Sequence, residues 1–429
     1  MLSAVKSQTS ASFLQVVFNL SDVAVVGKFA GPIALGAVGS TSILVTLFTG
    51  ILLGLSNGVN ALTALYIGSK NETDVKETVH TAAILCFCTG VFITLLGIAF
   101  SRPILTAMHT KDELIEDALI YLRIYLLGMP ALGIFNFGNS VLSAAGDTKR
   151  PLYFLSLAGV LNVLMNLFFV IVCRMNVAGV AIASILAQYF SAAMVLVLLL
   201  RTKECFGLKP SALKISPNKL KRIIRIGIPS AFQYAIFALA NLFVQTGVNS
   251  FDHVMVEGNS AASNADPLVY DMMAAFYTAC TSFIARNYGA QKKDRIRKSF
   301  LICMLYSFLV GLILGVGIYL LRYPFLGLFT NDSSVINAGI NRLSVMALSY
   351  SVSAFMDNSI AASRGLGRTI LPTIMVILGS CVFRILWIYT VFAYFKTIES
   401  LYLLYVFSWL ITAIAEIPSA TAGARRRRR

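Results

Sequence analysis

The chain carries very little charge for its length. Only 13% of its 429 residues are Asp, Glu, Lys or Arg, roughly half the share that is usual for a soluble globular protein. A folded chain in water needs charged residues on its surface, so this scarcity excludes an ordinary soluble protein. In contrast, 57% of the residues are hydrophobic.

Residues that build metal and redox centres are also scarce. The three histidines, His80, His109 and His253, lie near different predicted loops, and most of the seven cysteines fall inside apolar stretches. Cys86 and Cys88 have the wrong spacing for a zinc or redox pair. We therefore expect no metal site, no resident cofactor and no catalytic cluster, which argues against an enzyme.

Long apolar runs take the place of these features. The mean hydropathy is +0.78, and stretches of about 20 residues with little or no charge recur, the length that crosses ~30 Å of hydrocarbon as a helix. Strands of a membrane barrel would alternate over ~10 residues instead. The sequence thus predicts an all-α polytopic membrane protein with twelve transmembrane helices. The predicted spans are approximately 11–27, 33–67, 79–101, 118–145, 151–173, 178–200, 226–250, 260–286, 299–321, 339–363, 370–393 and 401–420.

The second half of the chain repeats the first at an offset of 221 residues. Gly68 matches Gly289, Pro103 matches Pro324, Gly146 matches Gly367, Thr148 matches Thr369 and Pro151 matches Pro372. These matches fall at loops and helix ends, where Gly and Pro fix the backbone path. We predict a six-helix N-terminal lobe (1–200), a cytoplasmic linker (201–225), a six-helix C-terminal lobe (226–420) and a basic tail (421–429). Repeats with an even number of helices are related by a pseudo-two-fold axis along the membrane normal, as in many transporters.

The positions of the basic residues indicate orientation. More than half of the 35 Lys and Arg fall in five alternate loops, and five more form the run Arg425–Arg429. By the positive-inside rule both termini are cytoplasmic. The net charge of +16 is then explained by contact with anionic lipid, without a nucleic-acid partner. The polar start of the chain shows no signal-peptide pattern.

Several motifs resemble the multidrug and toxic compound extrusion (MATE) family. The segments concerned are 19–31, 34–39, 136–151, 177–184, 225–230, 259–264 and 364–367. The resemblance implies a plasma-membrane antiporter, and we expect it to work by alternating access between the two lobes. It implies export of varied, often cationic, amphipathic organic compounds, driven by an inward H⁺ or Na⁺ gradient, and we expect a monomer. Two regions depart from the family pattern. Lys6–Thr9 occupy the region where a helix-bending proline often lies in the family, and Phe237 lies in the neighbourhood where some sodium-using members have a glutamate.

One polar group in the N-terminal lobe is a candidate ion-coupling site. Asp22 and Asn166 fall at similar depth in the outer half of the membrane at ~1.5 Å per residue, and Asn162 and Asn166 share one helix face. A carboxylate beside two amide carbonyls can hold a proton or a small desolvated cation. Ser184 is a weaker fourth candidate. The alternative is that Asp22 bonds to nearby backbone and the two Asn hold helices together. The resemblance, matched at Asp22, Asn162 and Asn166, favours ion coupling.

The C-terminal lobe has charged residues of its own within predicted spans. Asp271 and Arg384 lie at similar depth, so we expect them to form an ion pair that either locks the lobe or contacts substrate. Asp357 occupies the position equivalent to Asn136 in the repeat. We expect Glu416 to lie near the inner interface.

Substrate-binding residues cannot be separated from packing residues by sequence. The candidates for lining a cavity are Asn136, Gln188, Gln233, Asn241 and Gln245. The main rival function is a flippase for lipid-linked oligosaccharide or cell-wall precursor, which would require a strongly cationic central cavity. A membrane enzyme or a channel is less compatible with a six-helix repeat that contains buried acids.

Overall fold

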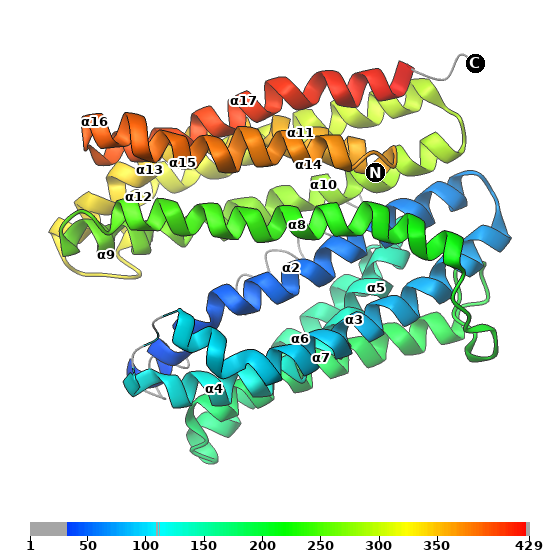
Figure 1. Ribbon diagram of the computed structural model, residues 1–429, viewed down its shortest axis with the longest axis horizontal. Helices are drawn as coiled ribbons and strands as arrows, with labels where there is room; N and C mark the ends of the chain where they lie inside the picture. The colour runs from blue at the N-terminus through cyan, green and yellow to red at the C-terminus, as the bar shows by residue number, and fades with distance from the viewer. Residues whose placement is uncertain (1–31, 109, 111, 426–429) are drawn as a thin grey trace. The chain divides into compact units, whose positions relative to one another are not determined.

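The computed structural model describes residues 32–108, 110 and 112–425, and all regular elements among them are helices (Figure 1). The chain divides into two compact units, with the boundary between Ala231 and Phe232. The predicted span 11–27 lies outside the described residues.

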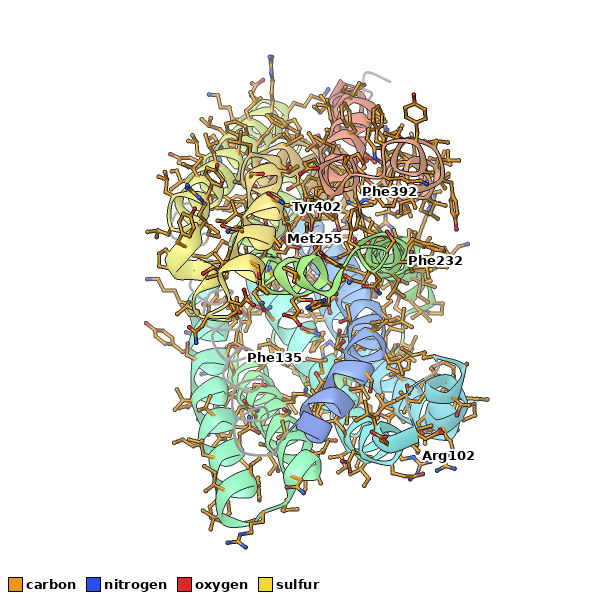
Figure 2. The ribbon with its side chains drawn as sticks, turned by 90° about the vertical axis from the view of Figure 1, so that its left-hand side faces the viewer. Arg102, Phe135, Phe232, Met255, Phe392 and Tyr402 are labelled. Atoms are coloured by element: carbon orange, nitrogen blue, oxygen red, sulfur yellow. The ribbon has the colours of Figure 1, made fainter. Side chains whose placement is uncertain are left out.

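The first unit is a helical bundle with apolar cores. Its helices are α2 (Pro32–Gly68), α3 (Glu72–Ala107), α4 (Asp112–Leu126), α5 (Met129–Ala145), α6 (Lys149–Leu167) with the π-helical turn η2 (Phe168–Val172), α7 (Asn176–Arg201), the 3₁₀ turn η3 (Pro210–Ala212) and the first part of α8 (Pro217–Val248). The largest core joins α2, α3, α5 and α7, and includes Val79, Phe137 and Val195, none of which is exposed. Phe135 lies among these helices (Figure 2).

The second unit contains the rest of α8 and the remaining helices. These are α9 (His253–Ser263), α10 (Ala265–Gly289), α11 (Lys293–Leu320), α12 (Arg322–Leu326), α13 (Ser333–Gly365), α14 (Ile370–Val376), η4 (Ile377–Val382), α15 (Phe383–Trp387), η5 (Ile388–Phe392), α16 (Ala393–Phe395) and α17 (Ile398–Arg425). Elements α14 to α16 form one nearly continuous helix with two π-helical stretches. The main core of the second unit is built on α13 and α17 and includes Tyr350 and Tyr402. Tyr402 is labelled in Figure 2.

Backbone conformations repeat at the same offset as the sequence. Gly146 and Gly367 end equivalent helices with positive φ angles of 94° and 74°, and Lys70 and Gln291, also 221 positions apart, have φ angles of 57° and 58°. A left-handed residue after a helix satisfies its last carbonyl groups, and glycine reaches that conformation without steric strain. The predicted duplication is therefore visible in local backbone geometry that the sequence match alone does not contain.

At one pair of equivalent positions, the helices of the two halves contact each other in different ways. In the first unit the Thr94 hydroxyl of α3 donates a hydrogen bond of 2.6 Å to the carbonyl of Leu126. The equivalent residues in the second unit are Gly315 of α11 and Ala347 of α13. A Cβ atom on Gly315 would lie only 2.0 Å from the Ala347 carbonyl oxygen. Glycine here lets two membrane helices approach closely, as small residues commonly do in bilayers.

The described helices fit a bilayer. Nine are long and apolar enough to span it, and α4 with α5, bent by 45°, can form a tenth span. α13, which contains the predicted span 339–363, has 33 residues but is not among those nine. Large apolar side chains on the helix surfaces, such as Phe92, Leu164 and Ile313, are more than half exposed in the isolated chain, as expected for residues that face lipid.

Two predicted boundaries are wrong. The span 118–145 is not one helix, because the chain bends between Leu126 and Met129, where Gly128 and Pro130 follow each other closely. Proline lacks the N–H group that would continue the α4 hydrogen-bond ladder, so a new helix starts there. The linker predicted as 201–225 ends earlier, since α8 already begins at Pro217.

Candidate functional site

The structure brings three of the four predicted coupling residues together. Asn162 and Asn166 lie on α6, and the Asn166 amide donates to the Asn162 oxygen over 3.3 Å. The Asn162 amide in turn lies 3.5 Å from the hydroxyl of Ser184 on α7. Both Asn residues are buried. Asp22, the predicted acid of this group, lies outside the described residues.

The local helix geometry distinguishes this amide cluster (Asn162, Asn166 and Ser184). The π-helical turn η2 begins two residues after Asn166. Such turns widen the helix and often mark functional sites in membrane and soluble proteins. Amide and hydroxyl oxygens are hard ligands that accept hydrogen bonds or coordinate small cations. The arrangement can therefore hold a proton shared with a carboxyl group, or a desolvated Na⁺.

The second unit contains a buried ion pair that the sequence analysis missed. Arg342 on α13 donates to Asp266 over 2.6 Å and to the oxygen of Asn259 over 2.8 Å. The Tyr350 hydroxyl donates to the other Asp266 oxygen over 2.5 Å, and the Tyr402 hydroxyl donates to Asn259 over 3.1 Å. Only 5% of the Arg342 side chain is exposed. The available signal was the similar depth of Arg342 and Asp266 near the ends of their predicted spans.

Arg384 does not pair with Asp271, and that prediction was wrong. Its Nε donates to the Ser408 hydroxyl over 3.3 Å and its Nη1 to the Asn241 oxygen over 2.9 Å. No ion pair between described residues includes either Arg384 or Asp271. The sequence argument matched depth along the membrane normal, but depth does not fix the direction in which a helical residue points.

The other predicted polar residues of this unit fall in separate environments. Asp357 is half-buried on α13, two turns before Arg364. Arg364 donates to the oxygen of Gln233 over 2.9 Å. Gln245 donates to Asn249, the residue that follows the end of α8, over 2.9 Å. Gln233 thus contacts a charged group, whereas Gln245 bonds to the turn after its own helix.

In the first unit, the two remaining cavity candidates are enclosed to different degrees. Asn136 is buried within α5. The side-chain oxygen of Gln188 on α7 is sealed from solvent without a hydrogen-bond partner, and it lies against Gly128, where an added Cβ would meet it at 2.2 Å. The cavity-lining role of both residues stays a prediction.

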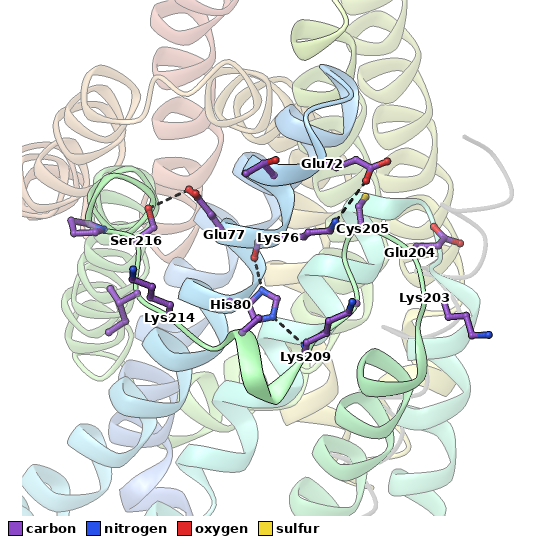
Figure 3. A pocket seen from close by; sticks show the side chains of 15 residues that line it. Glu72, Lys76, Glu77, His80, Lys203, Glu204, Cys205, Lys209, Lys214 and Ser216 are labelled. Atoms are coloured by element: carbon purple, nitrogen blue, oxygen red, sulfur yellow. Dashed lines mark hydrogen bonds and ion pairs between the residues drawn. The ribbon is translucent and has the colours of Figure 1, made fainter.

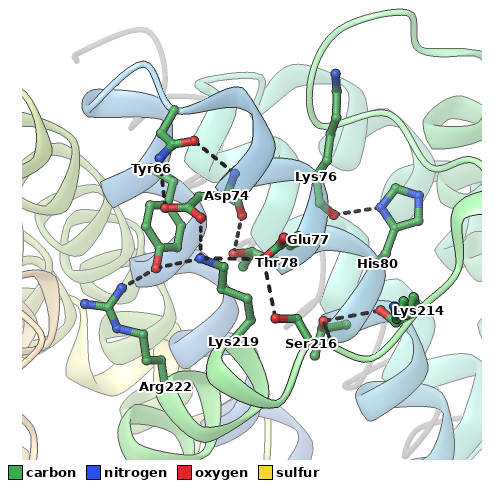
Figure 4. A network of polar contacts seen from close by, with 12 residues as sticks. Tyr66, Asp74, Lys76, Glu77, Thr78, His80, Lys214, Ser216, Lys219 and Arg222 are labelled. Atoms are coloured by element: carbon green, nitrogen blue, oxygen red, sulfur yellow. Dashed lines mark hydrogen bonds and ion pairs between the residues drawn. The ribbon is translucent and has the colours of Figure 1, made fainter.

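Within the first unit, a polar network joins the linker and the start of α8 to α2 and α3 (Figure 4). Lys219 donates to Asp74 over 2.5 Å and to the Tyr66 hydroxyl over 3.2 Å, and Arg222 also contacts that hydroxyl. Beside it, His80 bonds the Lys76 carbonyl over 2.7 Å through Nδ1, and its Nε2 accepts from the Lys209 backbone N–H over 3.1 Å. The linker is therefore attached to α3 by directed bonds.

A cavity of about 480 Å³ lies under the linker. Figure 3 shows charged side chains of both signs around it, from the first turns of α3 and from the linker. The Lys76–Glu72 pair spans 3.8 Å at its edge. In the part of the chain that the structure covers, no group of three His, Cys, Asp or Glu side chains is arranged to hold a metal ion.

Comparison with known proteins places the chain in a family. The MatE family model matches residues 9–168 and 229–390, which is both halves of the repeat. The "Probable multidrug resistance protein YoeA" of Bacillus subtilis is 23% identical over 374 residues, covering 86% of this chain and 81% of that protein. The "FAD transporter" of Shewanella oneidensis is 25% identical, covering 74% of this chain and 71% of its own length.

Solved structures share the fold. The "Crystal structure of MATE in complex with MaL6" superimposes with a TM-score of 0.93 at 21% identity, covering 99% of this chain and 95% of that one. This match confirms the predicted all-α fold of twelve membrane helices in two repeats. Because the matched family consists of membrane transporters, the protein is a transporter and not an enzyme. The chain is a multi-pass membrane protein that belongs to the MATE family.

Proposed function

We propose that this protein is a secondary active exporter of amphipathic organic compounds, driven by an inward gradient of H⁺ or Na⁺. Membership of the MATE family supports transport, and several relatives are named multidrug resistance proteins. The proposed energy source is an ion gradient across the membrane. Each charge that moves down the membrane potential supplies about 2.3 kcal/mol per 100 mV.

The observation that carries the proposal is the amide cluster of Asn162, Asn166 and Ser184. A buried set of neutral oxygen ligands stabilises a small cation or a protonated carboxyl group, but it carries no charge with which to hold an ion permanently. Asp22 supplies that charge in the proposed site. Burial would favour the protonated acid when the site is closed, and opening to the cytoplasm would favour release.

The proposed orientation places both termini in the cytoplasm. It is supported by the alternation of loops rich and poor in Lys and Arg. The linker then faces the cytoplasm, together with the Lys219 network and the cavity below it. Cysteine labelling from the two sides of intact cells tests this, with single cysteines in loops 201–216 and 327–332.

Ethidium uptake into everted membrane vesicles tests the proposed function. We expect uptake to follow an imposed H⁺ or Na⁺ gradient and to stop when that gradient is dissipated. Comparing the two ions one at a time identifies the coupling ion. The flippase alternative would be supported by two results together: ethidium uptake that depends on neither gradient, and translocation of a lipid-linked sugar by the purified protein.

Variants of the proposed site test its role. Asp22→Asn and Asn166→Leu should leave expression intact and abolish uphill uptake. Ser156→Ala is a matched control, since Ser156 lies on the same helix as Asn166 but its hydroxyl bonds the Leu152 carbonyl of its own backbone. Normal uphill uptake by a well-folded Asp22→Asn protein would refute the coupling role.

A further inference from the structure

Arg384 is a charged side chain enclosed in the second unit without an acidic partner. It is only 2% exposed, and its hydrogen bonds go to two neutral groups, Ser408 and Asn241. None of the ion pairs among the described residues includes it. An uncompensated guanidinium inside a membrane protein is unfavourable, and such residues commonly serve transport. Arg384 therefore needs an explanation beyond packing.

The surroundings of Arg384 are aromatic. Its guanidinium carbon lies 4.6 Å from the ring centre of Tyr405, 5.7 Å from that of Phe237 and 6.0 Å from that of Trp409. Tyr405 and Trp409 also pack on each other, with ring centres 5.6 Å apart. These rings stabilise the cation and leave unused the N–H donors that do not bond to Ser408 or Asn241.

A second guanidinium lies near the same ring. That of Arg342 is 5.7 Å from the centre of Tyr405, and Asp266 neutralises Arg342 through an ion pair. Among the described residues, no carboxylate forms an ion pair with Arg384, so neutral groups and aromatic rings surround its charge.

Arg384 retains hydrogen-bond donors for a ligand. A guanidinium has five N–H groups, and only two are used here. Nη2 makes no hydrogen bond with the described residues. It is also not one of their solvent-inaccessible polar atoms that lack a partner, so part of its surface is accessible. Its neighbour Asn241 is exposed on α8, which places this edge beside the surface of the unit.

We propose that Arg384, with Phe237, Tyr405 and Trp409, binds the anionic group of an aromatic substrate in the second unit. The site takes a planar ring that carries a carboxylate or phosphate. The anion accepts from Nη2 in a charge-assisted bond, and the ring packs on the aromatic side chains. This inference rests on the proposed transport function and specifies one of its substrate classes. Purely cationic compounds are excluded from this site by the charge of Arg384.

Binding of three naphthalene compounds to the protein in nanodiscs tests the proposal. Naphthylacetate, naphthylethanol and naphthylethylamine share one ring and differ in charge, and protein-free nanodiscs correct for partition into lipid. We expect naphthylacetate to bind most tightly. Arg384→Gln should weaken naphthylacetate binding about tenfold or more, and naphthylethanol binding less than about twofold. Arg384→Lys should keep part of the preference.

A second variant decides the result if Arg384→Gln does not fold. Asn241→Asp places a carboxylate at the atom that now lies 2.9 Å from Nη1, so it pairs the guanidinium internally and should remove the preference for the anion. Arg322→Gln is the matched control, because Arg322 also stacks on two rings, Tyr319 and Tyr323, away from the site. It should bind all three compounds like the unaltered protein.

The proposal is overturned if naphthylacetate binds no more tightly than naphthylethanol, or if folded Asn241→Asp protein keeps the full preference. Because binding is measured without a gradient, these outcomes do not depend on ion coupling. If binding behaves as expected but neither gradient drives ethidium uptake, the antiport proposal fails and the anion site stands.

Discussion

Replacing Gly315 by alanine should separate two membrane helices. The new Cβ would lie 2.0 Å from the Ala347 carbonyl oxygen, and real Cβ atoms essentially never approach closer than 3.0 Å. Helices α11 and α13 must therefore move apart by about 1 Å at this point. Overpacking of this kind costs about 1–3 kcal/mol. The higher helix propensity of alanine acts in the opposite direction and stabilises the variant by up to about 1 kcal/mol.

Gly317, two residues along the same helix, provides a matched control. An added Cβ there meets nothing within 4 Å, so Gly317→Ala gains helix propensity without a clash. The propensity gain is common to both variants, and their difference in unfolding free energy isolates the clash at about 1–3 kcal/mol. Unfolding by SDS in mixed micelles, followed by tryptophan fluorescence, measures that difference. Equal stability of the two alanine variants would refute the close approach.

Three further perturbations have expected outcomes. Asp266→Asn leaves the buried Arg342 without its counter-ion and should lower stability by about 3–5 kcal/mol in the same SDS titration; an effect below about 1 kcal/mol would mean that the pair is solvated. Lys219→Met removes the ammonium group of a side chain that is only 9% exposed and should speed proteolysis of the linker in everted vesicles; an unchanged cleavage rate would contradict the attachment of the linker to α3. Burial, together with the charge of Glu72, raises the pKa of the Cys205 thiol, so maleimide should alkylate Cys205 slowly at pH 7 and faster as the pH rises. Glu72→Gln should increase that rate at pH 7, because it removes a charge that disfavours the thiolate.

Much of the fold could be predicted from sequence because each helix end in one copy of the repeat has an equivalent in the other copy. Positions such as Gly146 and Gly367 carry backbone conformations that few other residues adopt, so their match indicated equivalent helix ends before any coordinates. The bend at Gly128 was missed because hydropathy is continuous across it, although Pro130 was a visible signal. The start of α8 was missed because its first turns are basic and resemble a loop in composition.

The candidate site could be predicted only where residues lie on one helix or share a motif. Asn162 and Asn166 are one turn apart, so their contact follows from helix geometry. Whether residues on two different helices come into contact depends on how each helix is rotated about its own axis. Sequence periodicity does not fix that rotation when a helix has apolar residues on all sides. The Arg384–Asp271 pairing failed for this reason, and the Arg342–Asp266 pair was overlooked.

The attachment of the linker to α3 has a consequence for biogenesis. The bonds made by His80 and Lys219 lie within the part of the chain that ends at Ala231. When the ribosome has passed that residue, roughly 200 residues remain to be translated, which takes about 10–40 s at 5–20 residues per second. Helix packing is far faster. The described helices of the first half can therefore assemble, and fasten the connecting segment at the membrane surface, while the second half is still being synthesised.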